Sequence, residues 1–305
     1  MAGSENAAES LDVERGGSMR ENKFESIKRV WYRLSKNIPA VVGIVIVALV
    51  ILAAIFAKQI APYPDHDGAY VNFAEANVAP CAQHLFGTDN MGRDVFSRLL
   101  ISLRSALLMG ILVLAISVPV GFILGVVAGY MKGSFVEVII MRVTDIFLSL
   151  PPLVLALAIA SVLKPNLTNA MIAITIMWWP WYARLSYSIS SSLRAENYVI
   201  YAELTGAGAL HILTKEILPN CISPVLTKMT VDMGLVIMMG ATLGFVGLGE
   251  QPPAPSLGNM IADGIKYIPG QWWVTIFPAV FIIIIVLGFN LIGDGVSALF
   301  TVEEA

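Results

Sequence analysis

The sequence predicts an all-α membrane protein that crosses a bilayer six times. Hydrophobic residues make up 57% of its 305 residues and charged residues only 13%, a balance that excludes an ordinary water-soluble domain. A helix needs about 20 apolar residues to cross about 30 Å of hydrocarbon. Because lipid cannot hydrogen-bond to open backbone groups, such segments must be helices rather than strands. The segments that qualify are 38–57, 107–130, 143–163, 167–185, 225–249 and 272–293.

Residues 1–37 precede the first span and predict a cytoplasmic tail followed by an amphipathic helix. Their first apolar run begins late and no small-residue cleavage site follows it, so they do not have the pattern of a signal peptide. Lys28, Arg29, Arg33 and Lys36 lie just before the span at 38–57. Positive charge beside a span favours the cytoplasmic side, so we expect the N-terminus inside. Six spans then place the C-terminal tail, 296–305, inside as well.

The segment 58–106 is then an extracytoplasmic loop. Its second half predicts an interfacial helix that leads into the second span, with Asp94 in the first helical turn, where a negative charge meets the helix dipole. Asp65, His66 and Asp67 are three consecutive side chains in a proline-rich turn, which cannot readily converge on one metal ion. We therefore expect a solvated turn there.

The segment 107–295 is expected to form a five-helix core. Gly121, Gly125 and Gly129 repeat every four residues, as do Gly240 and Gly244, and such small faces favour close helix packing within one bundle. Tryptophans lie near predicted span ends or beside Pro180 and could stack on ligands, but for most of them the position is typical of an interfacial belt: Trp178, Trp179, Trp181, Trp272 and Trp273.

Charged and polar side chains inside the predicted spans are candidate gate or pathway residues: Arg142, Asp145, Asp232, Asn290 and Asp294. A charge at bilayer depth costs about 2.5–3.5 kcal/mol on insertion scales, so it normally faces a pore or a partner. Arg142 and Asp145 are three residues apart and could pair on one helical face. Asp232 is the deepest acid. It could line a pathway or pair with Lys228, one turn earlier.

The most informative segment is the polar stretch at about 186–224, between two apolar spans. Ala202, Gly206 four residues later, and Leu218-Pro219 beyond them predict a helix, a tight turn, a second helix and a stop. A compact hairpin that projects from a membrane bundle is suited to docking.

The two cysteines fall on opposite sides in this topology, Cys81 in the outer loop and Cys221 in the inner one, so they cannot pair.

Several chemistries lack their motifs. The sequence has no Gly-x-x-x-x-Gly-Lys-Ser/Thr phosphate loop, no His-Glu-x-x-His and no Gly-x-Ser-x-Gly. No basic stripe indicates nucleic-acid binding. We therefore expect no ATP site, cofactor, metal or catalytic residue in this chain.

The hairpin resembles the cytoplasmic coupling loop of ABC importer permeases, whose pattern is Glu-Ala-Ala, three residues, Gly, nine residues, Ile-x-Leu-Pro. Ala202, Gly206, Leu218 and Pro219 match this pattern, whereas Ile200, Tyr201 and Glu216 differ from it. Segments 84–98, 243–258 and 289–294 resemble hallmarks of the C-type subunit in the dipeptide, oligopeptide and nickel permease branch. Together the similarities cover about residues 24–296.

The resemblance implies a type I ABC importer transmembrane domain in the cell inner membrane. It implies a homologous B-type permease partner, two ABC ATPases that bind ATP and Mg, and an extracytoplasmic binding protein. The residues that it assigns to ATPase coupling are Glu196, Tyr198, Ala202, Glu203, Gly206, Ala207, Leu218, Pro219 and Asn220.

The expected substrate is a di- or oligopeptide, with nickel complexes, glutathione and oligosaccharides as alternatives within the same machinery. An ion-coupled secondary transporter, with Asp145 and Asp232 as proton carriers, would be expected to show an inverted repeat. The sequence shows no such repeat.

Overall fold

The computed structural model describes residue 32 and residues 35–301, and this part of the chain is helical without β-strands. The expected all-α fold is confirmed. The predicted cytoplasmic tail and most of the amphipathic helix before the first span lie outside the described residues, as do residues 302–305 of the predicted C-terminal tail. The helices are α2 (Ile38–Ile55), α3 (Ala57–Ile60), α4 (Val95–Tyr130), α5 (Phe135–Leu148), α6 (Pro152–Val162), α7 (Leu167–Leu193), α8 (Asn197–Leu204), α9 (Ala209–His211), α10 (Leu218–Phe245), α11 (Leu257–Gly264) and α12 (Trp272–Thr301).

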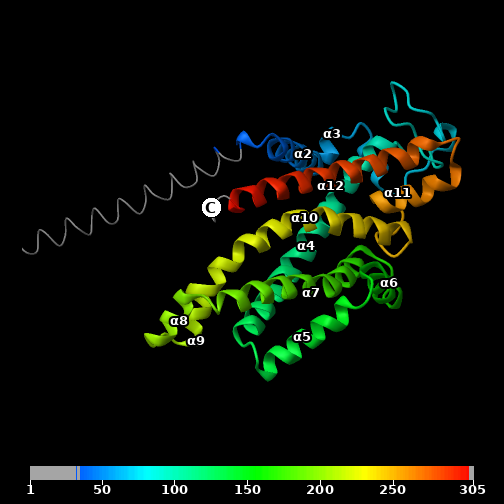
Figure 1. Ribbon diagram of the computed structural model, residues 1–305. Helices are drawn as coiled ribbons and strands as arrows, with labels where there is room; N and C mark the ends of the chain where they lie inside the picture. Colours follow the sequence, from blue (N-terminus) through cyan, green and yellow to red (C-terminus); the bar gives the residue numbers. More distant parts are fainter. Residues whose placement is uncertain (1–31, 33–34, 302–305) are drawn as a thin grey trace, which may run out of the picture.

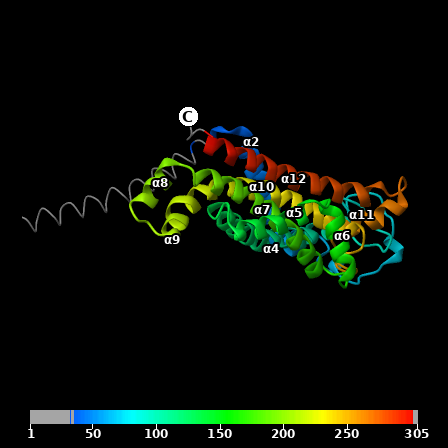
Figure 2. The same cartoon turned by 60° about the horizontal axis from the view of Figure 1, so that its bottom comes forward.

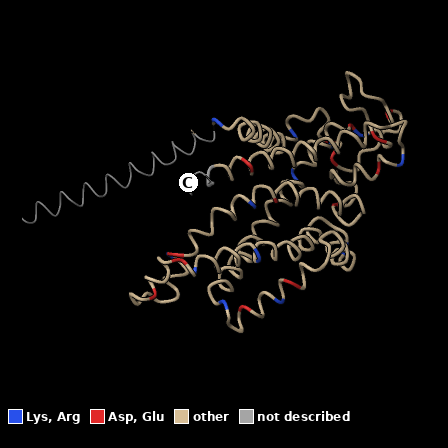
Figure 3. The backbone as a smooth tube through the Cα atoms, viewed as in Figure 1, with Lys and Arg blue, Asp and Glu red and all other residues tan. Residues whose placement is uncertain are grey.

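Figure 1 shows the long helices side by side as one elongated bundle. At one end, which we call the hairpin end, residues 194–217 project with α8 and α9. At the other, which we call the capped end, residues 56–94 lie beside α11. Figure 2, turned by 60°, shows the same separation of the two ends. Figure 3 shows charged residues gathered towards these ends, with few along the middle of the bundle.

Four stretches of the described chain are long and apolar enough to cross a membrane: Ile38–Ile55, Val95–Tyr130, Ala209–Phe245 and Trp272–Ala298. The pair α5 and α6 makes a fifth if it counts as one span. The remaining expected segment is α7, which has 27 residues. Its second half carries serines, tyrosines and Arg184, so α7 falls outside this apolar class. The polar second half of α7 is therefore poorly suited to face lipid.

The boundaries of two spans differ from those expected. The interfacial helix and the second span form one 36-residue helix, α4, because nothing between Val95 and Leu107 breaks it. The segment 143–163 is not one helix: α5 ends at Leu148 and α6 begins at Pro152, with an 89° bend between them. Pro151 and Pro152 explain the break, since proline removes a backbone donor and clashes with the preceding turn. α12 continues as helix through Thr301, into the predicted C-terminal tail.

Glycines set the closest helix contacts, as the four-residue spacing predicts. A methyl group on Gly121 would lie 2.6 Å from Cβ of Tyr182, and one on Gly129 would lie 2.7 Å from Cβ of Ser190. Both neighbours belong to α7, so the glycine face of α4 packs within the bundle. Ser190 Oγ donates a hydrogen bond across this contact to the carbonyl oxygen of Val126, at 2.9 Å.

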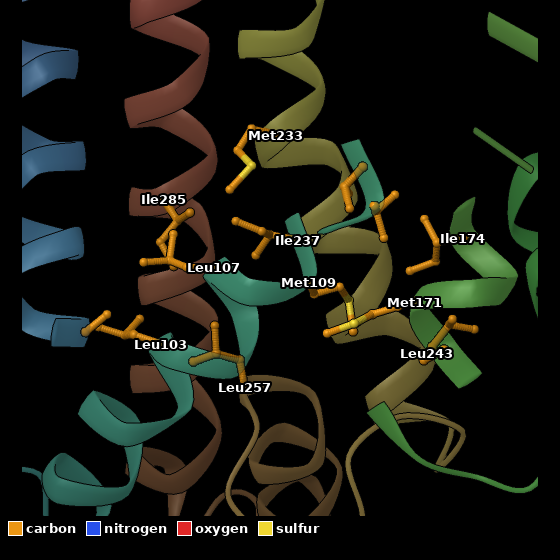
Figure 4. Close-up of a cluster of buried hydrophobic side chains, with 14 of the residues drawn as sticks. Leu103, Leu107, Met109, Met171, Ile174, Met233, Ile237, Leu243, Leu257 and Ile285 are labelled. Carbon is orange, nitrogen blue, oxygen red and sulfur yellow. The ribbon is translucent and has the colours of Figure 1, made fainter. Parts of the chain in front are cut away.

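The first and last helices close the bundle in a similar way. A methyl group on Gly43 of α2 would lie 2.8 Å from the carbonyl oxygen of Gly288 in α12. One on Gly288 would lie 2.8 Å from Ile46. Figure 4 shows the main core between α4, α7, α10 and α12, where flexible methionines fill gaps among branched side chains: Leu103, Leu107, Met109, Met171, Ile174, Met233, Ile237, Leu243, Leu257 and Ile285.

Candidate functional site

The projecting segment at the hairpin end begins with α8, which ends in a tight turn at Gly206. Gly206 has φ +88°, a conformation that residues with a Cβ rarely adopt. Ala207 N–H donates to the Ala202 carbonyl oxygen at 2.9 Å, and Gly206 N–H donates to that of Glu203 at 3.0 Å. This pair of bonds is a Schellman helix end, which normally brings two apolar side chains together. Here they are Ala202 and Ala207, which explains why both positions are small.

A second, smaller core anchors the hairpin to the bundle. Its buried members are Val126 of α4, Val199 of α8, Ile212 and Ile217 of the turn that precedes α10, and Cys221 of α10. Ala202, Ala207 and Leu213 pack against them. Because α4 contributes to this core, the hairpin is held on the bundle rather than hanging from it as a free loop.

The outer surface of the hairpin is apolar. The exposed fractions are 66% for Tyr201, 77% for Leu204 and 75% for Leu210. Exposed apolar side chains this large, gathered on a small projecting element, mark a protein contact surface. We call Tyr201, Leu204 and Leu210 the hairpin surface.

Other residues assigned to coupling by resemblance are exposed as well: Glu196, Tyr198, Glu203, Pro219 and Asn220. Asn220 Nδ2 donates to the Glu216 carbonyl oxygen at 2.7 Å and to the Tyr198 hydroxyl at 3.3 Å. The bond to Tyr198 ties the start of α10 to α8, so most of the residues assigned to coupling by resemblance lie on one small unit.

The expected stop at Leu218-Pro219 is wrong. α9 passes through a π-helical turn, Ile212–Ile217, directly into α10, whose first residues are Leu218 and Pro219. Proline is tolerated in the first turn of a helix, and the wider π turn leaves space before its ring. The second arm of the hairpin is therefore continuous with α10, and the polar loop proper is shorter than 186–224, since α7 ends at Leu193.

The intramembrane acids have partners that local spacing did not reveal. Asp145 pairs with Arg184 of α7, not with Arg142, which is exposed. Arg184 lies far along the chain from Asp145, so no helical period could indicate this pair. The partly exposed ends of both side chains lie on the outside of the contact between α5 and α7.

Asp232 is 1% exposed and bridges α10 and α7. Its Oδ1 accepts from Lys228 Nζ at 3.1 Å, and its Oδ2 accepts from Trp178 Nε1 at 2.9 Å. Trp178 is buried midway along α7, so it does not belong to the interfacial belt expected for most of the tryptophans. The pair with Lys228 was one of the two alternatives for Asp232, and the indole partner was not foreseen.

The two remaining candidates lie on α12. Asp294 is exposed near its end, whereas Asn290 is half-buried. Asn290 Oδ1 has no hydrogen-bond partner among the described residues. The structure does not bring either residue together with Asp145 or Asp232 in a contact within the described chain.

At the capped end, a buried polar cluster replaces the expected solvated turn. His66 is 4% exposed and stacks on Tyr70, with ring centroids 3.9 Å apart. Its Nδ1 accepts from Asp94 N–H at 2.9 Å, and Asp94 in turn accepts from Ser97 N–H at 2.8 Å. Arg98 donates to the His66 carbonyl oxygen at 2.8 Å and to that of Pro253 at 3.2 Å. The motif in segment 84–98 thus holds the capped end together.

Burial lowers the pKa of His66 below its ordinary value, against the opposing effect of Asp94. A lowered folded-state pKa means that the unfolded chain binds more protons, so this contribution to stability is complete above about pH 6.5 and is lost as the pH falls below it. We expect the melting temperature of the purified chain in detergent to fall between pH 7.5 and about pH 5. His66→Asn, which keeps a neutral acceptor, should show a weaker dependence.

The matched control is His211→Asn, because His211 is exposed. It should melt with the same pH dependence as the unmodified chain. An identical pH dependence for His66→Asn and the unmodified chain would contradict the role given to His66.

The chain is similar to known proteins along most of its length. Residues 121–301 match the family described as binding-protein-dependent transport system inner membrane component. Residues 27–80 match the N-terminal TM domain of oligopeptide transport permease C. A chain in the inward-facing MetNI methionine ABC transporter is similar with a TM-score of 0.49 and 22% identity, covering 66% of this chain and 91% of that one.

Two curated relatives cover nearly the whole chain. The probable D,D-dipeptide transport system permease protein DdpC of Escherichia coli K12 is 40% identical, over 92% of each chain. The dipeptide transport system permease protein DppC of Alkalihalophilus pseudofirmus is 38% identical, over 88% of this chain and 87% of the relative. The chain therefore belongs to the family of inner-membrane permease components of binding-protein-dependent transport systems, in its branch of dipeptide and oligopeptide permeases.

Proposed function

We propose that the chain is the C-type permease subunit of an ATP-driven importer for di- or oligopeptides. With a homologous B-type permease it forms the translocation path. Two partner ATPases bind ATP and Mg and supply the energy, and an extracytoplasmic binding protein delivers the peptide. The observation that carries the proposal is the hairpin surface, an exposed apolar patch on a unit that is anchored to the bundle.

The hairpin is built to transmit motion. A docked ATPase would contact Tyr201, Leu204 and Leu210, and the second core beneath them resists local bending. α9 continues through the π turn into α10, so a push on the hairpin moves a membrane helix. Rigid-body transfer of this kind is how domain motion couples separate sites.

The hairpin end faces the cytoplasm in this proposal, and the capped end faces outward. This orientation puts Cys81, which is exposed, outside the cell. Cys221 is fully buried in the second core. We expect a membrane-impermeant maleimide to label Cys81 in intact cells and to leave Cys221 unlabelled, both there and in inverted vesicles, until the chain is denatured.

Cys81→Ser serves as the control, because it should remove all labelling from intact cells. A Cys81 thiol that reacts only in inverted vesicles, and not in intact cells, would overturn the topology.

The contacts support different roles for the intramembrane candidates. Asp232 and Asp145 are each paired with a cation from the same chain, which favours a structural role over proton transfer. In the described chain, Arg142, Asn290 and Asp294 form no ion pair. These three residues stay candidates for lining the translocation path. The ion-coupled alternative, which needs Asp145 and Asp232 free to titrate, is correspondingly disfavoured.

The test is uptake by the whole complex. The four kinds of subunit are reconstituted in proteoliposomes with a radiolabelled dipeptide outside and ATP inside. We expect uptake that needs ATP and the binding protein, and that persists when ionophores collapse ion gradients. Nickel complexes, glutathione and an oligosaccharide are assayed in parallel. Uptake driven by an ion gradient without ATP would refute the importer, and exclusive uptake of another substrate would refute the peptide.

A further inference from the structure

Lys228 places a partly exposed positive charge on α10, within the expected span 225–249. Its side chain is 29% exposed. Its partner Asp232 is almost fully buried, with a side chain only 2% exposed. The carboxylate is thus fixed inside the protein, whereas the ammonium group lies at the edge of the bundle.

Two aromatic rings of α7 lie close to the ammonium group of Lys228. Nζ of Lys228 lies 5.8 Å from the ring centroid of Trp181 and 5.6 Å from that of Tyr182. Trp181 is 42% exposed, whereas Tyr182 is fully buried. Both distances are within the range of a cation–π contact. Trp181 and Lys228 therefore share one open patch, with Tyr182 and Trp178 behind it.

The surrounding surface is unsuited to lipid. Trp181, Arg184 and Ser188 follow one another at helical spacing and form one partly exposed face of α7. Arg184 carries the pair with Asp145 on this face. A charge that faces hydrocarbon costs up to about 2.5–3.5 kcal/mol at the bilayer centre. α7 is a long helix that falls outside the apolar class expected of a lipid-facing span. Water or transported solute is the neighbour that this face fits.

We propose that Lys228 and Trp181 form a site on the translocation path that binds the carboxylate of a peptide in transit. This inference rests on the proposed function and names a contact that the peptide makes on the path. An ammonium group has three donors, and one of them is directed at Asp232, so others are available to an incoming carboxylate. Trp181 offers an apolar ring to the neighbouring peptide group or side chain.

Asp232 keeps this site weak. Its Oδ2 is held by Trp178, so the carboxylate stays in place while Lys228 shares its charge between Asp232 and the peptide. A transport path needs sites that are favourable enough to enter and weak enough to leave.

The site is tested by thiol chemistry in the complete complex. The native thiols are removed by Cys81→Ser and Cys221→Ala, and Trp181→Cys is introduced. Reaction with anionic sulfonatoethyl methanethiosulfonate is compared with that of the cationic trimethylammonium analogue. The comparison is repeated with Lys228→Met and Asp232→Asn together, which removes the ammonium without leaving a buried lone carboxylate. Leu49→Cys of α2, a 61% exposed position on a wholly apolar helix, is the lipid-facing control.

We expect Trp181→Cys to react several-fold faster with the anionic reagent, and the double substitution to abolish this preference. A dipeptide supplied during ATP turnover should slow the reaction at Trp181→Cys and leave Leu49→Cys unchanged. Equal rates with both reagents, or a preference that survives the double substitution, would overturn the anion site. A reaction rate at Trp181→Cys that is the same with and without the dipeptide would overturn the substrate contact. Failure of the cysteine-free complex to import any peptide would instead count against the proposed function, because the reagent preference is measured without transport.

Discussion

Replacing Gly125 by leucine is expected to prevent the chain from forming a stable bundle. A side chain at Gly125 would run into the carbonyl oxygen of Ala183 and come within 2.8 Å of Cβ of Ser186, both in α7. The nearest of these atoms is backbone, so it cannot move aside as a flexible side chain could. Overpacking a core typically costs about 1–3 kcal/mol, and a forced separation of two helix backbones belongs at the upper end of that range. Size-exclusion chromatography and thermal melting of the purified chain in detergent measure the loss.

Gly208→Leu is the matched control for this substitution. Gly208 has φ −71° and ψ 158°, which any residue can adopt, and no atom lies within 4 Å of a Cβ built there. It should elute and melt like the unmodified chain. Equal stability of Gly125→Leu and Gly208→Leu would show that α4 and α7 do not depend on a glycine contact.

Replacing Leu204 by glutamate is expected to abolish transport without unfolding the chain. Leu204 is 77% exposed, so the folded subunit gains no buried charge. In the proposed complex the same side chain enters the ATPase contact, where an unpaired buried charge costs about 3–5 kcal/mol. A loss of that size corresponds to a fall of more than about a hundredfold in affinity. Co-purification of the ATPases with the permease, and uptake in proteoliposomes, are the measurements.

Glu203→Gln is the matched control, because it shows whether any substitution on α8 reduces ATPase binding or only one at Leu204. Glu203 is the neighbouring residue on α8 and is also exposed, but its side chain is polar already. It should keep the ATPases bound and transport close to the unmodified level. Normal ATPase binding by Leu204→Glu would exclude the hairpin surface as the docking site.

Local patterns predicted most of the helices and the tight turn. Apolar runs indicated the first span to within two residues and the start of the last one, since a minimum length is dictated by the bilayer, whereas α12 continues beyond 293. The spacing of Gly121, Gly125 and Gly129 indicated a packing face correctly because one helical turn brings those positions together. Gly206 indicated the turn because few other residues tolerate its backbone conformation.

Features that depend on distant partners could not be read from the sequence. Arg184 and Trp178 reach the acids Asp145 and Asp232 only because α7 folds back beside α5 and α10. The burial of His66 likewise depends on Asp94 and Tyr70 closing around it. Pro219 was misjudged for a different reason: a proline ends one helix or begins the next, and the π turn that decides between these has no clear sequence signature.

The contact between Gly43 and Gly288 has a consequence for how the chain is made. Ribosomes release α2 early and α12 last, yet each is the other's close neighbour. During synthesis α2 must therefore remain in the bilayer without its final partner until nearly the whole chain has been inserted. A chain cut short before Gly288 would contain most of the bundle but could not close it, and its unpaired first helix would mark it as incomplete to the quality-control proteases of the membrane.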